Sequence, residues 1–130
     1  MFEQPTQILD IWLERLNAGE LENTAALYCQ IAVLLPTFSD KAARTPEAVR
    51  KYFEALSSHK GLRVSLHPDS VVVQRISEMI HCISGLYCWH FEPGNEEKNV
   101  EARFTFAVDL TLEAPIIHHH SSQVPEAARQ

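Results

Sequence analysis

The sequence predicts an α+β domain in which helices come first and an antiparallel sheet follows. Three segments with helical spacing of apolar residues lie in the first half of the chain, at about 6–17, 20–28 and 45–57. Most of the remaining chain alternates apolar and polar residues with a period of two, which is typical of strands. Helices grouped ahead of a meandering sheet favour a layered packing over a parallel sheet with crossover helices.

The helix boundaries follow from local chemistry. The first helix carries an apolar stripe, made by Ile8, Leu9, Trp12, Leu13 and Leu16. Gly19 follows this helix, in the position where glycine takes a left-handed conformation at low cost. The third helix begins with Thr45 as N-cap and Pro46 at the first helical position.

Strands fill the rest of the chain. A short apolar strand, Ala32–Leu35, ends at Pro36. Further strands are expected at 62–67, 70–75 and 78–91, and a polar turn at 92–98.

Two C-terminal runs, 99–110 and 115–122, are predicted to form the middle of the sheet and to carry whatever site exists. In the first run one face is apolar and the other is small or polar, with Arg103 on the polar face. The apolar face consists of Val100, Ala102, Phe104, Phe106 and Val108. One sheet face must cover the helices and the other a partner, because so large an apolar surface would be sticky in water. We therefore expect at least a homodimer.

Length and charge exclude several classes of protein. A chain of 130 residues forms one domain, 1–130, with 124–130 as a tail. A net charge of −6 without a basic patch argues against nucleic acid and membrane partners. No signal peptide is evident and the three cysteines lack metal-ligand spacing, so we expect reduced thiols and a cytoplasmic protein.

Three consecutive histidines lie in the last predicted strand. Alternation places His118 and His120 on one face and His119 on the other. Two ligands two residues apart need a third from elsewhere, and the sequence offers no supporting pair, so we expect no metal and no cofactor.

Four stretches carry a family resemblance: Leu16–Glu20, Arg50–Leu56, Glu101–Phe104 and above all Ile116–Pro125, with its His-x-His step and following proline. The chain resembles the nuclear transport factor 2-like superfamily, and most of all the calcium/calmodulin-dependent protein kinase II association domain and its free-standing, SnoaL-like bacterial relatives. The resemblance implies a cystatin-like fold, in which a strongly curved mixed or antiparallel sheet wraps three helices as a cone. It also implies assembly through the sheet and a pocket in the cone.

The resemblance also implies a site. It places His119 and Ser121 in the pocket with Arg103 and Tyr87, and Val49 where the family has a pocket histidine. Thr105 and Trp89 complete the predicted ligand-binding set, although Trp89 is also a good core residue. Arg103 would anchor a carboxylate through its planar fork; the alternative is a structural ion pair with Glu101 or Asp109.

Three functions remain open. The first, which we favour, is a self-associating domain that holds a small polar or anionic ligand in the cone. The second is a ketosteroid isomerase-like or cyclase-like enzyme without a metal. Such an enzyme needs a carboxylate base, yet Leu34–Pro36 occupy the place where relatives carry it. The third is a purely structural association module. For the enzyme alternative, the sequence does not identify catalytic residues.

Overall fold

The computed structural model describes residues 2–126, which include all of the strands and helices expected from the sequence. The helices are α1 (Pro5–Asn17), α2 (Leu21–Ala25) and α3 (Pro46–Ser57). The strands are β1 (Tyr28–Leu35), β2 (Arg63–Leu66), β3 (Val72–Arg75), β4 (Ile80–Phe91), β5 (Lys98–Asp109) and β6 (Ile116–Gln123). Short 3₁₀ turns occupy Pro68–Ser70 and Pro93–Asn95. Part of the predicted tail, 127–130, lies outside the described residues.

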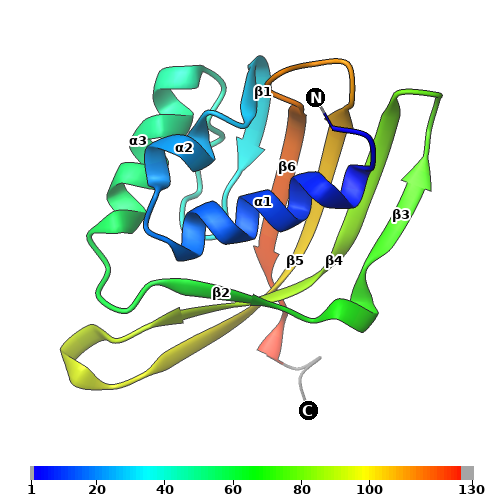
Figure 1. The fold of residues 1–130 in the computed structure, drawn as a ribbon. Helices are drawn as coiled ribbons and strands as arrows, with labels where there is room; N and C mark the ends of the chain where they lie inside the picture. Colours follow the sequence, from blue (N-terminus) through cyan, green and yellow to red (C-terminus); the bar gives the residue numbers. More distant parts are fainter. Residues whose placement is uncertain (1, 127–130) are drawn as a thin grey trace.

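One curved sheet wraps the helices (Figure 1). Its strand order is β1-β6-β5-β4-β2, and β3 also pairs with β4. Strand β1 runs parallel to β6, whereas the other pairs are antiparallel. The prediction of a curved, mixed sheet with β5 and β6 at its centre is therefore confirmed.

Strand β4 is long enough to pair with two strands on its outer edge. Strand β2 pairs with its second half and β3 with its first half. Ser70 bridges the gap between them, because its hydroxyl accepts a hydrogen bond from the Leu86 amide at 2.8 Å and donates one to the His67 carbonyl at 2.6 Å. Gly85 makes this approach possible, since a Cβ there would lie 3.0 Å from both Ser70 Oγ and the Phe104 ring.

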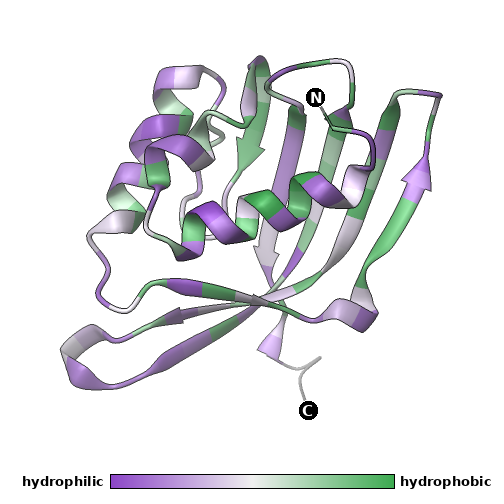
Figure 2. Ribbon diagram, viewed as in Figure 1, coloured by the Kyte–Doolittle hydropathy of each residue, from purple (hydrophilic) through white to green (hydrophobic). Residues whose placement is uncertain are grey.

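The apolar face of β5 lies against the helices within the single chain. Phe106 is 1% exposed and contacts Trp12 of α1 edge to face at 5.5 Å. Hydropathy follows this arrangement, and β6, with its histidines and serines, is the most hydrophilic of the central strands (Figure 2). The alternation was predicted correctly, but this apolar face needs no partner; the opposite face of β5, with Arg103, forms the outside of the sheet.

The boundary between α2 and β1 differs from the prediction. The helix expected over 20–28 ends at Ala25, and β1 begins at Tyr28 rather than at Ala32. An irregularity between Tyr28 and Val33 leaves Gln30 and Ile31 both exposed, which interrupts the alternation in the sequence. Because helical spacing and an irregular strand look alike over a few residues, the pattern favoured the helix.

We expect Gly85→Ala to destabilise the fold by about 1–2 kcal/mol, because overpacking outweighs the gain from removing a flexible glycine. Phe104 stacks on Tyr87 at 4.6 Å and Ser70 is held by its hydrogen bonds, so neither can move aside freely. Urea unfolding measures the effect. Ser84→Ala, on the opposite face, is the matched control; equal stability of the two variants would contradict the packing argument.

Candidate functional site

A chain of buried hydrogen bonds crosses the interior of the cone. The indole Nε1–H of Trp12 on α1 donates to the Tyr28 hydroxyl at 3.0 Å. The Tyr28 hydroxyl lies 2.7 Å from Nδ1 of His119 on β6. On the other side of the ring, Nε2 of His119 lies 3.1 Å from the Tyr87 hydroxyl.

The chain continues to the surface. The Tyr87 hydroxyl donates to Ser121 Oγ at 2.7 Å, and Ser121 Oγ is hydrogen-bonded to Thr37 Oγ1. The Tyr87 proton goes to Ser121, so the Tyr87 hydroxyl accepts from Nε2 of His119, which carries the ring proton. Nδ1 then accepts from the Tyr28 hydroxyl, which in turn accepts from the Trp12 indole. These hydrogen bonds therefore run in one direction from Trp12 to Ser121.

Burial keeps this network neutral. It lowers the pKa of His119 well below its usual value, and the neighbouring His118 and His120 lower it further. Burial also raises the pKa values of Tyr28 and Tyr87 far above the ordinary value for tyrosine. Each group thus exchanges hydrogen bonds in its uncharged form, which is the form that a low-dielectric interior favours.

Aromatic rings fill the space around the chain. Trp12 stacks on Tyr87 at 5.7 Å, and Phe106 stacks on the His119 ring at 3.9 Å. The interior cavity that remains has no room for a water molecule. Two buried donors at this cavity, Tyr52 Oη and Trp89 Nε1, have no hydrogen-bond partner among the described residues.

The structure separates the predicted ligand-binding residues into two groups. Four point inward to this interior: Tyr87, Trp89, His119 and Ser121. Arg103 and Thr105 lie on the outside of the sheet, where Arg103 pairs with Leu86 and Ser122 in the ladder. The prediction that Arg103 shares a pocket with Tyr87 is therefore wrong, because odd-numbered residues of β5 face away from the helices.

The ion pair predicted as an alternative for Arg103, with Glu101 or Asp109, is not formed among the described residues. Arg103 is exposed and has no ion-pair partner within residues 2–126. Glu101, one predicted partner, is hydrogen-bonded to Nε2 of His67 at 2.8 Å, and this contact is the main cause of its lowered pKa. His118 and His120 face outward and His119 inward; alternation predicted the opposite faces, and the resemblance predicted which face lies inside.

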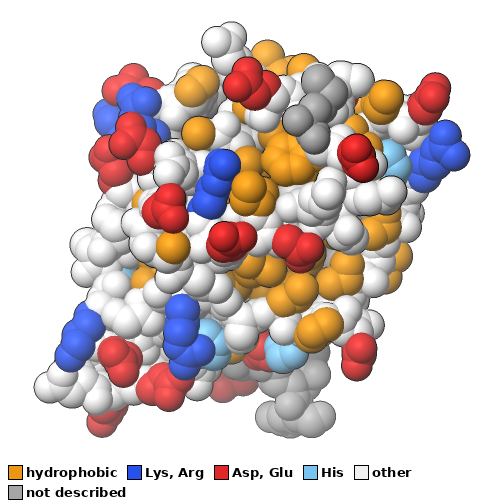
Figure 3. Space-filling view, viewed as in Figure 1, with side chains coloured by type: hydrophobic (Ala, Val, Ile, Leu, Met, Phe, Trp, Pro, Cys, Tyr) orange, Lys and Arg blue, Asp and Glu red, His pale blue; other side chains and the backbone are white. Residues whose placement is uncertain are grey.

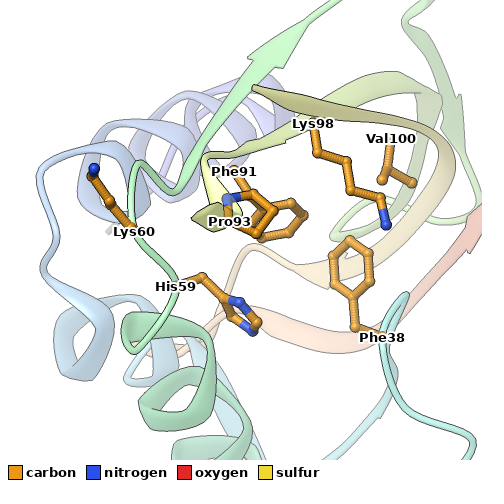
Figure 4. A pocket seen from close by; sticks show the side chains of 7 residues that line it. All are labelled: Phe38, His59, Lys60, Phe91, Pro93, Lys98 and Val100. Carbon is orange, nitrogen blue, oxygen red and sulfur yellow. The ribbon is translucent and has the colours of Figure 1, made fainter. Parts of the chain in front are cut away.

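A second cavity, of about 370 Å³, was not predicted. It lies between the loop after β1, the turn after α3 and the β4–β5 hairpin, and we call it the hairpin cavity (Figure 4). Its lining comprises Phe38, His59, Lys60, Phe91, Pro93, Lys98 and Val100. These residues come from segments that read as turns and strand ends, and no local sequence pattern indicates that they meet.

Metal coordination has little support in this part of the chain. Between residues 2 and 126 no group of three or more histidine, cysteine, aspartate or glutamate side chains is arranged to hold an ion. Likewise, none of the described helices is long and apolar enough to cross a membrane.

The curved sheet and its enclosed helices define a nuclear transport factor 2-like, cystatin-like domain. An uncharacterised protein with a cystatin-like fold from Caulobacter vibrioides superposes with a TM-score of 0.78 at 13% identity, covering 95% of this chain and 89% of that one. A ketosteroid isomerase-like protein from Erwinia carotovora atroseptica gives 0.77 at 10% identity, with 92% and 93% covered. At these identities the likeness concerns the fold alone.

Within this class, residues 4–125 match the calcium/calmodulin dependent protein kinase II association domain family, and the chain belongs to it. A Xanthomonas campestris protein named for the same association domain has 28% identity and a TM-score of 0.81, with 93% of this chain and 86% of that chain covered. No curated protein sequence matches. The predicted superfamily is confirmed, and so is membership in the association domain family.

The buried His119 should make stability depend on pH. Its pKa is lowered in the folded protein, so below about pH 6.5 the unfolded chain takes up a proton that the folded chain does not. The free energy of unfolding therefore has its full value above that pH. It falls on acidification, by up to about 1.4 kcal/mol per pH unit. We expect His119→Gln to be less stable at pH 7.5 but to lose less on going to pH 5.

Denaturant unfolding at the two pH values tests this expectation. His59→Gln, which changes an exposed histidine that does not contribute to the His119 shift, is the control and should keep the wild-type slope. The assignment of a neutral, buried His119 is contradicted if His119→Gln also keeps that slope.

Proposed function

We propose that this chain is a self-associating domain that also binds a small polar or anionic ligand. The family supports the first half, since its members are association domains. The observation that carries the proposal is the division of the molecule into a filled interior, a weakly charged outer sheet face and a separate cavity beside the β4–β5 hairpin.

Self-association would use the outer face of the sheet. On the helix side, acidic and basic side chains are spread over the surface (Figure 3). On the outer face, rows of paired residues cross the strands with few charges: Val72–Ser84–Thr105–His120–Leu35 in one row and Gln74–Cys82–Ala107–His118–Val33 in the next. Exposed apolar side chains on this face, Leu35, Val72 and Leu86, would be covered by a second copy.

Ligand binding would use the hairpin cavity rather than the interior. The interior is closed by stacked aromatic rings and leaves no room even for water. The hairpin cavity is within the size range of small-molecule sites and combines aromatic walls with a few polar groups. Arg103, expected to be the anion anchor, lies outside both cavities.

The enzyme alternative lacks a base in the interior. No aspartate or glutamate is among the buried side chains of residues 2–126, and Leu34 is 1% exposed where relatives would place the base. His119 has both ring nitrogens engaged and no space beside it for a substrate. A purely structural association module would differ from our proposal only in binding no ligand.

We expect Leu86→Lys to dissociate the assembly. Leu86 is 37% exposed and pairs with Arg103, so a lysine there adds a second positive charge to the centre of the proposed interface. Light scattering at micromolar concentration should show a dimer or larger species for the wild type and a monomer for the variant. Ala55→Lys, on the exposed side of α3, is the control; a monodisperse wild-type monomer would refute self-association.

A further inference from the structure

The hairpin cavity has a distinct distribution of charge. Two lysines and a histidine line it and no carboxylate does, although the chain carries a net charge of −6. The acidic side chains nearby do not line it: Glu97 is 3.0 Å from Arg63 Nη2, and the Glu92 side chain lies against Gly61. The cavity is thus a basic site on an acidic protein, which favours an anionic ligand.

Lys98 is the cation available to such a ligand. Within residues 2–126 its amine has neither an ion-pair partner nor a side-chain hydrogen bond, and it extends over Phe38 (Figure 4). Lys60, by contrast, donates to Asn95 Oδ1 at 2.8 Å and points away from the other side chains. The ring of His59 packs on Phe91 at 5.1 Å and points into the cavity, where either of its protonation states offers a donor.

The rest of the lining is apolar and includes two aromatic rings. Phe38 contacts Phe91 edge to face at 5.2 Å, and Val100 and Pro93 extend this apolar surface. Phe38 is 39% exposed, whereas Phe91 is 8% exposed, so Phe38 offers most of the uncovered aromatic surface. A flat apolar group placed on Phe38 would cover its ring, whereas a bare inorganic anion would leave it exposed.

We propose that the hairpin cavity binds a small organic carboxylate with an aromatic body. The carboxylate lies between the Lys98 amine and the His59 ring, and the aromatic body lies on Phe38 and Phe91. This inference deepens the ligand-binding half of the proposed function and is independent of self-association.

Isothermal titration of the full chain with benzoate tests the proposal. Benzamide has the same shape without the charge, and inorganic phosphate has charge without the ring. We expect saturable binding of benzoate, and binding weaker by about tenfold or more for the other two, since hydrogen bonds to charged groups contribute most at such sites. The NMR signal of the Trp89 indole N–H should also shift when benzoate binds, because the Trp89 ring contacts the Phe38 ring at 5.4 Å.

Lys98→Met is the decisive variant, because Lys98 is exposed and its loss leaves the core intact. It should weaken benzoate binding by about tenfold and leave benzamide unchanged. Lys51→Met is the matched control, since Lys51 is exposed and pairs with Glu47 on α3, away from the cavity. Benzoate binding that Lys98→Met leaves unchanged would overturn the proposed site.

The outcomes separate the two proposals. Equal binding of benzamide and benzoate would overturn the carboxylate class while keeping ligand binding in the cavity. Absence of binding by all three compounds would overturn both the class and the ligand-binding half of the proposed function. Self-association is tested separately by light scattering, and its outcome does not depend on these titrations.

Discussion

The neutral His119 ring, hydrogen-bonded on both sides by tyrosines, is the interaction on which the interior depends. Tyr28 brings β1 to one nitrogen and Tyr87 brings β4 to the other. Trp12 adds the first helix, because its indole bonds Tyr28 and stacks on Tyr87. Helix and sheet are therefore joined by directional contacts as well as by apolar packing. Any member that lost its partner would leave a buried polar atom without a hydrogen bond, which is costly.

This arrangement explains why the interior does not act as a pocket. Trp12, Tyr87, Phe106 and Trp89 occupy the space that the curved sheet encloses. The polar groups of the His119 network are hydrogen-bonded to one another and are therefore not available to a ligand. Beside the β4–β5 hairpin, by contrast, Phe38 remains 39% exposed next to the buried Phe91, and the hairpin cavity stays open there.

Sequence patterns predicted the strands and the faces of their residues, but not which face would be the inside. Alternation correctly put His119 opposite His118 and His120. It also put Arg103 opposite Phe104, and the family resemblance then assigned the arginine to the pocket. Burial decides the matter physically: the helices need an apolar surface, so the phenylalanine side of β5 faces them and the arginine side faces out.

Other features depend on contacts between distant segments and leave no local signal. The hairpin cavity unites Phe38, His59 and Lys98, each of which is ordinary in its own stretch of sequence. Tyr28, at the start of β1, is hydrogen-bonded to His119, which lies 91 residues further along the chain. Spacing rules relate residues within one helix or strand, so contacts between distant segments appear only in the three-dimensional structure.

The separation between Tyr28 and His119 has a consequence for how the chain folds. Strand β1 can join the sheet only after β6 exists, because β6 is its sole neighbour there among the described strands. Pairings between distant segments carry a large loop-closure cost and form slowly. The hairpins of β4, β5 and β6 are contiguous in sequence, so they are suited to form first. During synthesis, Tyr28 must therefore wait for the last strand before its hydroxyl meets His119, whereas Trp12 can pack on Tyr87 and Phe106 once β4 and β5 have formed.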